Sequence, residues 1–252
     1  MPTDRNFDNL IDKFEQRVYG TLKGNLRLKL LKEDLLPLQQ SATLSIWDAG
    51  CGLAQISSWF AEAGHNTTLC DLSSRMLERA QQRFAEKNLT ATFLQGAAQD
   101  LAADLPKFDL VLFHAVLEWL TSPKETLYTV ANQVAPQGHL SLLYYNRNSI
   151  IITNALKGDW RLQFLLNDQY MGKGKNLTPP NPQFPHEVLN WLQQWGFRVK
   201  VETGIRVFND YLTPDAQQIT DQDELIELEY RYCREPTFKH MARYIHVIAQ
   251  RQ

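Results

Sequence analysis

The chain has 252 residues, of which 44% are hydrophobic and 21% charged, and a formal net charge of −2. This length allows one large domain whose buried core needs no disulfide or metal to stabilise it. The charge total neither indicates nor excludes a nucleic-acid partner. The three cysteines form no Cys-x-x-Cys pair, and no apolar run is long enough to span a membrane. We therefore expect a cytoplasmic protein with no metal site and no membrane segment.

Apolar strands alternate with helical patterns in the first part of the chain. Residues 1–40 have the pattern of a charged helical extension, which we expect to end at Pro37. The strands that follow are expected at residues 44–48, 66–71, 90–95, 109–113 and 139–145. Helices are expected over 55–63 and from Ser73 to about residue 87. This alternation predicts a parallel sheet covered by crossover helices.

The second part of the chain is less regular. Residues 147–185 carry a glycine-lysine run and four prolines, which predict an irregular, lid-like segment. A helix over 186–195, a strand over 197–203 and a final strand over 244–250 follow. Residues 204–243 separate these last two strands and include a helical pattern, so we expect them to form an insertion before the last strand.

A glycine-rich turn follows the first strand. Gly50 and Gly52 stand between Asp48 and a helix, where glycine lets the backbone approach a ligand closely. Asp71 ends the second strand 19 residues after Gly52, at a spacing where a carboxylate can bind ribose hydroxyls. Gln55 occupies the position where a dinucleotide-binding turn needs its third glycine, and the charge of Asp48 is unfavourable for a pyrophosphate. Asp48 suits an amine-bearing ligand, such as the amino-acid end of S-adenosylmethionine. A tight turn with no ligand is the alternative.

Two further places at the expected carboxyl edge of the sheet could contact an adenosine. Ala98 and Gln99 follow the third strand, where a short amide can bond the adenine amino group. His114 follows the fourth strand, at the edge where such sheets bind ligands. A helix cap for the pair and a packing role for the histidine are the alternatives. Trp119, five residues further on, is more typical of a core residue.

Four motifs together resemble the class I methyltransferases. They are the glycine turn, the acid of the second strand, the pair after the third strand and the fourth strand, at 48–52, Asp71, 99–100 and 108–114. The resemblance implies a single domain over residues 1–252 with a doubly wound, Rossmann-like α/β fold. Its seven-stranded sheet would end in an antiparallel strand. Ala54 stands where that family often has a third glycine, which is a mild departure.

A more specific resemblance extends from residue 4 to residue 247. The segments that carry it are 4–8, 19–21, 23–24, 69–73, 97–100, 112–119, 206–208, 210–212 and 243–247. They are similar to the bacterial tRNA 5-carboxymethoxyuridine methyltransferases. That family uses S-adenosylmethionine to convert the carboxylate of carboxymethoxyuridine, at the wobble position of tRNA, to its methyl ester.

The specific resemblance also implies which residues contact the cofactor. An arginine of the N-terminal helix belongs to the family's cofactor site, so the extension over 1–40 would cover the cofactor. Together with Asp48, the residues expected to bind the cofactor are Arg27, Gly50, Cys51, Gly52, Asp71, Ala98, Gln99 and His114.

Methyl transfer to a carboxylate needs no general base, because a carboxyl group with a pKa near ~4 is ionised at neutral pH. Direct in-line transfer then depends on orientation and on removing water from the nucleophile. A carboxylate taken out of water needs a partner, and an arginine fork is well suited to it. Arg206 is our candidate for this role, with Tyr145 as a second positioning group. A surface salt bridge with an acid of the insertion is the alternative for Arg206.

Charge is segregated along the second part of the chain. Residues 144–206 hold eight basic and four acidic residues, whereas 207–235 hold eight acidic and two basic ones. Such segregation can create a basic face on a protein of small net charge. Lys173 and Lys175, in the glycine run, are our candidates for phosphate contacts with tRNA. Solvated surface lysines are the alternative.

Three other functions compete with a tRNA methyltransferase. One is a methyltransferase for a small carboxylic acid or a phenol, with residues 147–185 as a lid. Another is a non-catalytic S-adenosylmethionine-binding module that regulates a partner. A nicotinamide-dependent oxidoreductase is disfavoured by Gln55 and Asp48.

Overall fold

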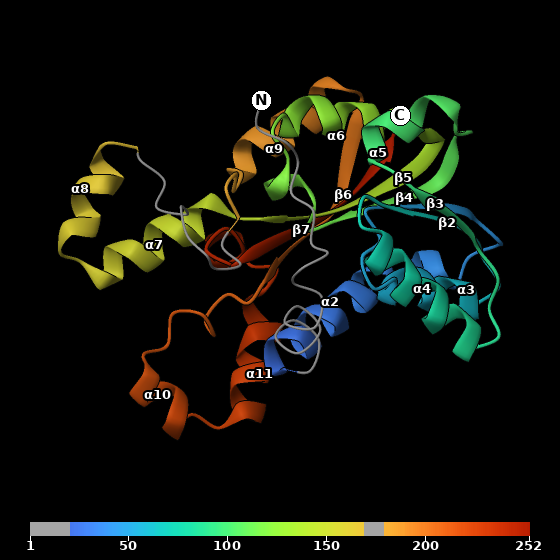
Figure 1. Cartoon of the computed structure of the whole chain (residues 1–252). Helices are drawn as coiled ribbons and strands as arrows, with labels where there is room; N and C mark the ends of the chain where they lie inside the picture. The colour runs from blue at the N-terminus through green and yellow to red at the C-terminus, as the bar shows by residue number, and fades with distance from the viewer. Residues whose placement is uncertain (1–20, 169–178) are drawn as a thin grey trace.

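The computed structural model describes residues 21–168 and 179–252, in which seven strands form one sheet (Figure 1). The strands are β1 Ser45–Ala49, β2 Asn66–Asp71, β3 Thr92–Gln95, β4 Phe108–His114, β5 Val134–Tyr145, β6 Phe197–Ile205 and β7 Tyr244–Arg251. Their order is β3-β2-β1-β4-β5-β7-β6, with β7 antiparallel to both of its neighbours and the other pairs parallel. This arrangement confirms the expected doubly wound, Rossmann-like α/β fold.

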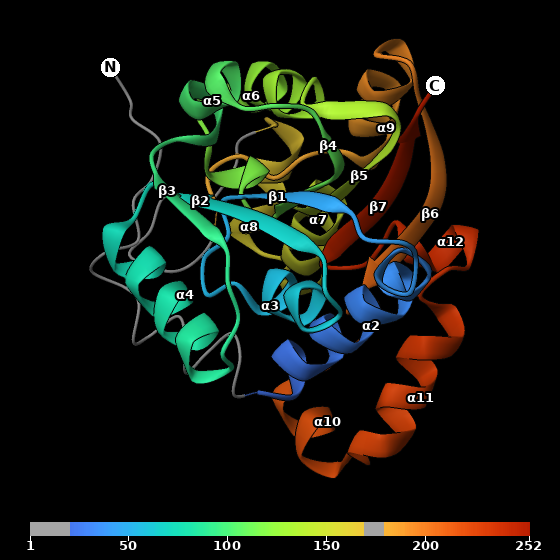
Figure 2. The same ribbon diagram turned by 90° about the vertical axis from the view of Figure 1, so that its right-hand side faces the viewer.

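Helices cover both faces of the sheet. They are α2 Leu22–Gln39, α3 Gln55–Glu62, α4 Ser74–Glu86, α5 Ala98–Leu101, α6 Pro123–Ala131, α7 Arg147–Lys157, α8 Trp160–Leu166, α9 Pro185–Gln194, α10 Pro214–Ile219, α11 Gln222–Tyr232 and α12 Pro236–Lys239. Figures 1 and 2 show α5, α6 and α9 on one face and α2, α3 and α4 on the other. The central strand β4 therefore holds a fully buried apolar run without alternation, Leu110 to Phe113, whereas Asp109 near its start is exposed.

The helix α2 continues beyond the proline at which we expected it to end. Thr21 caps its start by accepting a hydrogen bond from the Gly24 N–H at 3.2 Å. Pro37 lies inside the helix, two residues before its last residue Gln39. A proline removes one backbone donor and disfavours helix in the residue before it. Here the fully buried Leu35 anchors the last turns to the core, so the helix persists through the proline.

The segment 147–185 is more regular than the sequence predicted. Its first part forms α7 and α8, so the expectation of an irregular chain is wrong for residues 147–166. The side chain of Asn146 caps α7 by accepting from the Asn148 N–H at 3.0 Å, and Gly158 ends the helix with φ of +63°. The glycines and prolines that suggested irregularity lie after these helices. A lid role for the segment stays a prediction.

The helices α10, α11 and α12 lie between β6 and β7, in the range 204–243 where we expected an insertion. Both views place α10 and α11 at one end of the molecule, beside α2 (Figures 1 and 2). Among the helices of residues 21–168 and 179–252, we find none with the length and apolar character that a membrane crossing requires.

Candidate functional site

A cavity opens at the carboxyl ends of β1, β2 and β4, under α2. Its wall contains all nine residues at which we expected cofactor contacts, namely Arg27, Asp48, Gly50, Cys51, Gly52, Asp71, Ala98, Gln99 and His114. Trp119 lines it too and is only partly buried, so it is not the plain core residue that we expected. The fold thus brings the expected cofactor residues together, as ligand sites form at this edge of doubly wound sheets.

The turn after β1 has a backbone that leaves room for a ligand. Gly50 has φ of +88°, and a Cβ built there would lie 2.5 Å from Cγ2 of Val116, so the position requires glycine. Gly52 has φ of +52°. Ala54 also lies in the left-handed region, at φ +53°, where the related family often has glycine. An alanine in this conformation costs about 1 kcal/mol, which explains why the departure is tolerated.

Two carboxylates face this turn with different environments. The Asp71 carboxylate accepts hydrogen bonds from the backbone N–H groups of Gly52 and Ser73, each at 2.9 Å, which fixes its position at the end of β2. Asp48 accepts a hydrogen bond from the Ser57 hydroxyl at 2.7 Å. Burial raises the pKa of Asp48 to about 7, and the nearby charge of Asp71 adds to this rise. A bound ammonium group would stabilise the ionised form of Asp48, so this residue fits the amino-acid end of S-adenosylmethionine.

His114 is the first group of a buried chain of polar contacts. Its Nε2 lies 2.8 Å from the Ser141 hydroxyl, which in turn lies 2.9 Å from Nε2 of His246. Nδ1 of His246 lies 2.7 Å from the Asp34 carboxylate on α2. Burial, helped by the neighbouring His246 and Arg27, lowers the pKa of His114 well below its usual value, so the ring is neutral. The chain fixes the orientation of His114 at the cavity wall.

Asp34, Ser141 and His246 were not among the site residues expected from the sequence. A signal was present in the sequence, because Asp34 interrupts an apolar helix face and His246 interrupts an apolar strand. Such buried polar residues need partners. The sequence alone does not identify these partners, because Asp34 and His246 are 212 positions apart.

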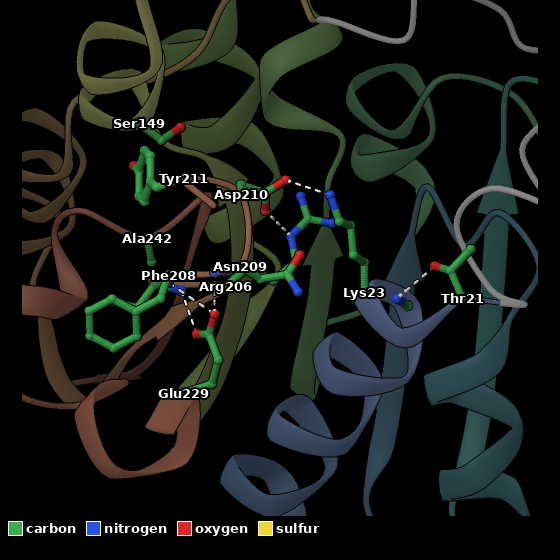
Figure 3. Close-up of polar contacts among 12 residues, drawn as sticks. Thr21, Lys23, Ser149, Arg206, Phe208, Asn209, Asp210, Tyr211, Glu229 and Ala242 are labelled. Atoms are coloured by element: carbon green, nitrogen blue, oxygen red, sulfur yellow. Dashed lines mark hydrogen bonds and ion pairs between the residues drawn. The ribbon is translucent and has the colours of Figure 1, made fainter. Parts of the chain in front are cut away.

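A cationic cluster lies beside the cavity, around Asp210. Arg206 follows β6 directly, and its Nε lies 2.8 Å from Oδ2 of Asp210. Nζ of Lys23, at the start of α2, lies 3.2 Å from Oδ1 of the same carboxylate (Figure 3). The side chains of Arg206 and Asp210 are only 14% and 12% exposed. Arg206 thus does pair with an acid of the insertion, Asp210. The pair is largely buried, so it differs from the surface salt bridge that was the alternative to a substrate role for Arg206.

The loop that carries Arg206 is held by an unusual contact. Arg206 has φ of +64°, a conformation that few residues with a side chain adopt. The carboxylate of Glu229 on α11 accepts hydrogen bonds from the next three backbone N–H groups, those of Val207, Phe208 and Asn209, at 2.5, 2.9 and 2.7 Å (Figure 3). The insertion therefore fixes the loop and the direction in which Arg206 leaves β6.

Two tyrosines in edge-to-face contact lie beside the cluster. The Tyr145 ring packs edge-on against that of Tyr244, with centroids 5.1 Å apart. The guanidinium of Arg206 lies 5.2 Å from the Tyr244 ring centroid, and that of Arg243 lies 4.8 Å from the Tyr145 centroid. Burial raises the pKa of Tyr244, and the positive charges of Arg206, Arg27 and Arg243 oppose this. Lys23 lies one helical turn before Arg27 on α2, and Tyr145 follows Leu143 by two residues on β5, so the cluster lies next to the cavity wall that Arg27 and Leu143 help to form.

Two other expectations concern nucleic-acid and metal binding. Lys173 and Lys175 lie outside the described residues, so their proposed phosphate contacts stay a prediction. Within residues 21–168 and 179–252, no group of three or more His, Cys, Asp or Glu side chains could hold a metal ion.

Comparison with known proteins connects this site to a family. The family model for a methyltransferase domain matches residues 47–142. A tRNA 5-carboxymethoxyuridine methyltransferase of Escherichia coli strain K12 is 39% identical over 254 residues, which cover 98% of this chain and 97% of the relative. A ubiquinone biosynthesis O-methyltransferase of Proteus mirabilis is 28% identical over 206 residues, covering 77% of this chain and 81% of the relative.

Solved structures agree on the fold. Magnesium protoporphyrin IX methyltransferase from Synechocystis PCC 6803, solved with bound SAH, has a TM-score of 0.64 at 17% identity, covering 98% of this chain and 96% of that one. A SAM-dependent methyltransferase from Archaeoglobus fulgidus has a TM-score of 0.62 at 16% identity, covering 95% and 99%. The expected enzyme class and cofactor are confirmed. The chain is a methyltransferase that uses S-adenosylmethionine, and it belongs to the tRNA 5-carboxymethoxyuridine methyltransferase family.

Proposed function

We propose that this enzyme methylates the carboxylate of 5-carboxymethoxyuridine at the wobble position of tRNA and gives its methyl ester. The observation that carries the proposal is the cationic cluster around Asp210, which lies beside the cofactor cavity and holds more positive than negative charge. Such a site favours an anionic acceptor group. The name of the relative that is 39% identical over nearly the whole chain specifies which anion this would be.

Different residues of the cavity wall are expected to bind different parts of the cofactor. When bound, S-adenosylmethionine supplies an activated methyl group on its sulfonium. We assign the ammonium end of the cofactor to Asp48, and its ribose to Asp71. The adenine would lie against Ala98 and Gln99, and the neutral ring of His114 would complete the wall. Arg27 would cover the ligand from α2.

The acceptor carboxylate is proposed to bind the guanidinium of Arg206, with Tyr145 as a packing surface. The acid is already ionised at neutral pH, so no proton has to be removed before it acts as a nucleophile. The contribution of the protein is then to orient the carboxylate and to exclude water from it. The buried ion pair with Asp210 and the hydrogen bonds to Glu229 keep Arg206 in place.

A phenol acceptor would need a base, and Glu118, which directly precedes the cavity residue Trp119, is the candidate for that role. It is 1% exposed, and burial raises its pKa to about 7, while hydrogen bonds and Arg27 oppose the rise. Glu118→Gln should keep most of the turnover on a carboxylate acceptor. A loss of turnover of more than about 100-fold with intact cofactor binding would favour the phenol reaction, since general bases contribute ~10²–10⁴-fold.

The substrate is tested with tRNA from cells that lack this enzyme and therefore hold the free acid. The protein, tRNA and S-adenosylmethionine are incubated, and the nucleosides are separated and weighed by mass spectrometry. Conversion of 5-carboxymethoxyuridine to its methyl ester supports the proposal. Methylation of small carboxylic acids without tRNA conversion would support the small-molecule alternative, and cofactor binding with no acceptor at all would support a regulatory module.

A further inference from the structure

The cationic cluster contains a second arginine that has no assigned role. Arg206, Lys23 and Arg243 all lower the pKa of Asp210, which outweighs the effect of its burial. Three cations thus share one carboxylate. Tyr211 and Tyr244, which also face the cluster, stay neutral because burial raises their pKa values. The three cations face two carboxylates, those of Asp210 and Glu229, so one positive charge is left over. Lys23 is 41% exposed, but Arg206 is only 14% exposed, and a partly buried excess of positive charge is costly without an anion.

Hydrogen-bonding groups in this cluster are also incompletely used. Nε of Arg243 is buried and has no hydrogen-bond partner among the described residues. Nε of Arg206 and Oδ2 of Asp210 form an ion pair at 2.8 Å, yet neither atom has a well-aligned hydrogen bond in this part of the structure. Buried donors usually have partners. Arg243 therefore holds a donor that an additional oxyanion could satisfy, while Nε of Arg206 stays paired with Asp210.

The backbone holds the two arginines side by side. The Arg243 N–H donates to the Arg206 carbonyl oxygen at 3.0 Å, where β6 ends and β7 begins. The buried side-chain amide of Asn146 donates to the carbonyl oxygens of His240 and Ala242, each at 2.8 Å, which fixes the turn before Arg243. Asn146 is therefore a structural residue of this turn.

We propose that Arg243 binds the substrate carboxylate together with Arg206, and that the pair makes the enzyme selective for the acid over its methyl ester. This inference rests on the proposed function. The negative charge of the substrate carboxylate compensates the excess positive charge of Lys23, Arg206 and Arg243. The ester product is neutral and leaves this positive charge uncompensated. The same contacts that hold the substrate thus favour release of the product.

The experiment measures binding of two tRNAs that differ only in the methyl ester. Wild type, Arg243→Gln and Arg198→Gln are titrated with the acid tRNA and with the ester tRNA in the presence of S-adenosylhomocysteine, so that no transfer occurs. Wild type should bind the acid at least about tenfold more tightly, as expected for hydrogen bonds to a charged group. Arg243→Gln should reduce this ratio to about threefold or less. Arg198, an exposed residue at the far end of β6, removes the same charge and should leave the ratio unchanged.

Several outcomes would overturn the inference. One is that wild type binds the acid tRNA and the ester tRNA equally well. Another is that a folded Arg243→Gln keeps the wild-type ratio of acid to ester affinity. The third is that Arg198→Gln loses this ratio to the same extent as Arg243→Gln. Unchanged cofactor affinity shows that the variant is folded. If Arg243→Gln does not fold, Arg243→Lys replaces it. That variant keeps the charge without the planar fork, so its ratio should fall severalfold, and an unchanged ratio would contradict the proposal. Failure of the proposed function looks different, because wild type would then transfer no methyl group to the acid tRNA.

Discussion

The affinity for S-adenosylmethionine should depend on pH through Asp48. In the free protein, burial raises the pKa of this carboxyl to about 7. Bound S-adenosylmethionine presents an ammonium group, and an opposite charge nearby favours the ionised carboxylate. Below pH 7, binding of S-adenosylmethionine therefore releases a proton from Asp48, whereas above pH 7 Asp48 is already ionised and no proton is released. From the linkage relation, the dissociation constant should fall about eightfold between pH 6 and pH 7.5. An α-amino group titrates near ~7.7–8.0, so the ligand's ammonium is still mostly protonated at the upper end of this range.

The same carboxyl should destabilise the free protein at high pH. Its pKa in the folded state lies above its ordinary value of 3.8, so the protonated form stabilises the fold at low pH. That stability is lost as the pH rises from about 4 through about 7. At pH 8 the loss reaches up to about 4 kcal/mol, since one pKa unit corresponds to about 1.4 kcal/mol. Asp48→Asn should therefore raise the Tm of the free protein at pH 8 and change it little at pH 4.

Calorimetric titration with S-adenosylmethionine and thermal unfolding test both consequences. Asp48→Asn should bind the cofactor more weakly and without pH dependence over this range. Ser57→Ala removes the hydrogen bond that opposes the rise of the pKa, so the midpoint of the pH dependence should move upward. A wild-type dissociation constant that varies less than twofold between pH 6 and pH 7.5 would refute the role given to Asp48.

Three further predictions concern the contacts that support the two sites. Asp34→Ala leaves the fully buried His246 without its acceptor and should lower the free energy of unfolding by about 3–5 kcal/mol, or the Tm by roughly 6–20 °C in a thermal melt; a shift under 2 °C would contradict the buried pair. Arg206→Met should reduce turnover with tRNA at least about 100-fold in single-turnover assays while cofactor affinity stays within threefold, and a near-normal rate would exclude Arg206 as the carboxylate ligand. Glu229→Ala should lower turnover about tenfold or more through displacement of Arg206, with unchanged cofactor affinity, and normal turnover would show that the loop needs no such support.

The sheet and the residues of the cofactor cavity could be predicted from the sequence, because short local patterns of residues specify them. Each strand is an apolar run bounded by turn residues. The glycine turn and Asp71 lie at the carboxyl ends of two strands that neighbour each other in the sheet, so their spacing in the sequence already predicts that they meet. The helices α7 and α8 were missed for a local reason too. Leu156, Trp160 and Leu166 are exposed at 69%, 51% and 80%, so their apolar pattern does not mark one buried helix face.

The contacts that support the loop carrying Arg206 could not be predicted, because they join residues that are distant in the sequence. Glu229 lies 22 positions after Val207, and nothing in the pattern of α11 indicates that its carboxylate faces three backbone N–H groups. The left-handed conformation of Arg206 is equally invisible, since an arginine in a sequence does not suggest a positive φ. Both features depend on the way the insertion folds back on the end of β6.

Formation of a methyl ester is tested by the chemical stability of the bond to the transferred methyl group. tRNA from cells that lack the enzyme is methylated with isotope-labelled S-adenosylmethionine and then treated with mild alkali, which hydrolyses esters but leaves methyl groups on nitrogen, carbon or ether oxygen in place. Alkali should release the label as methanol and restore 5-carboxymethoxyuridine in the digested tRNA. Label that stays on the tRNA after this treatment would show that the enzyme does not form a methyl ester.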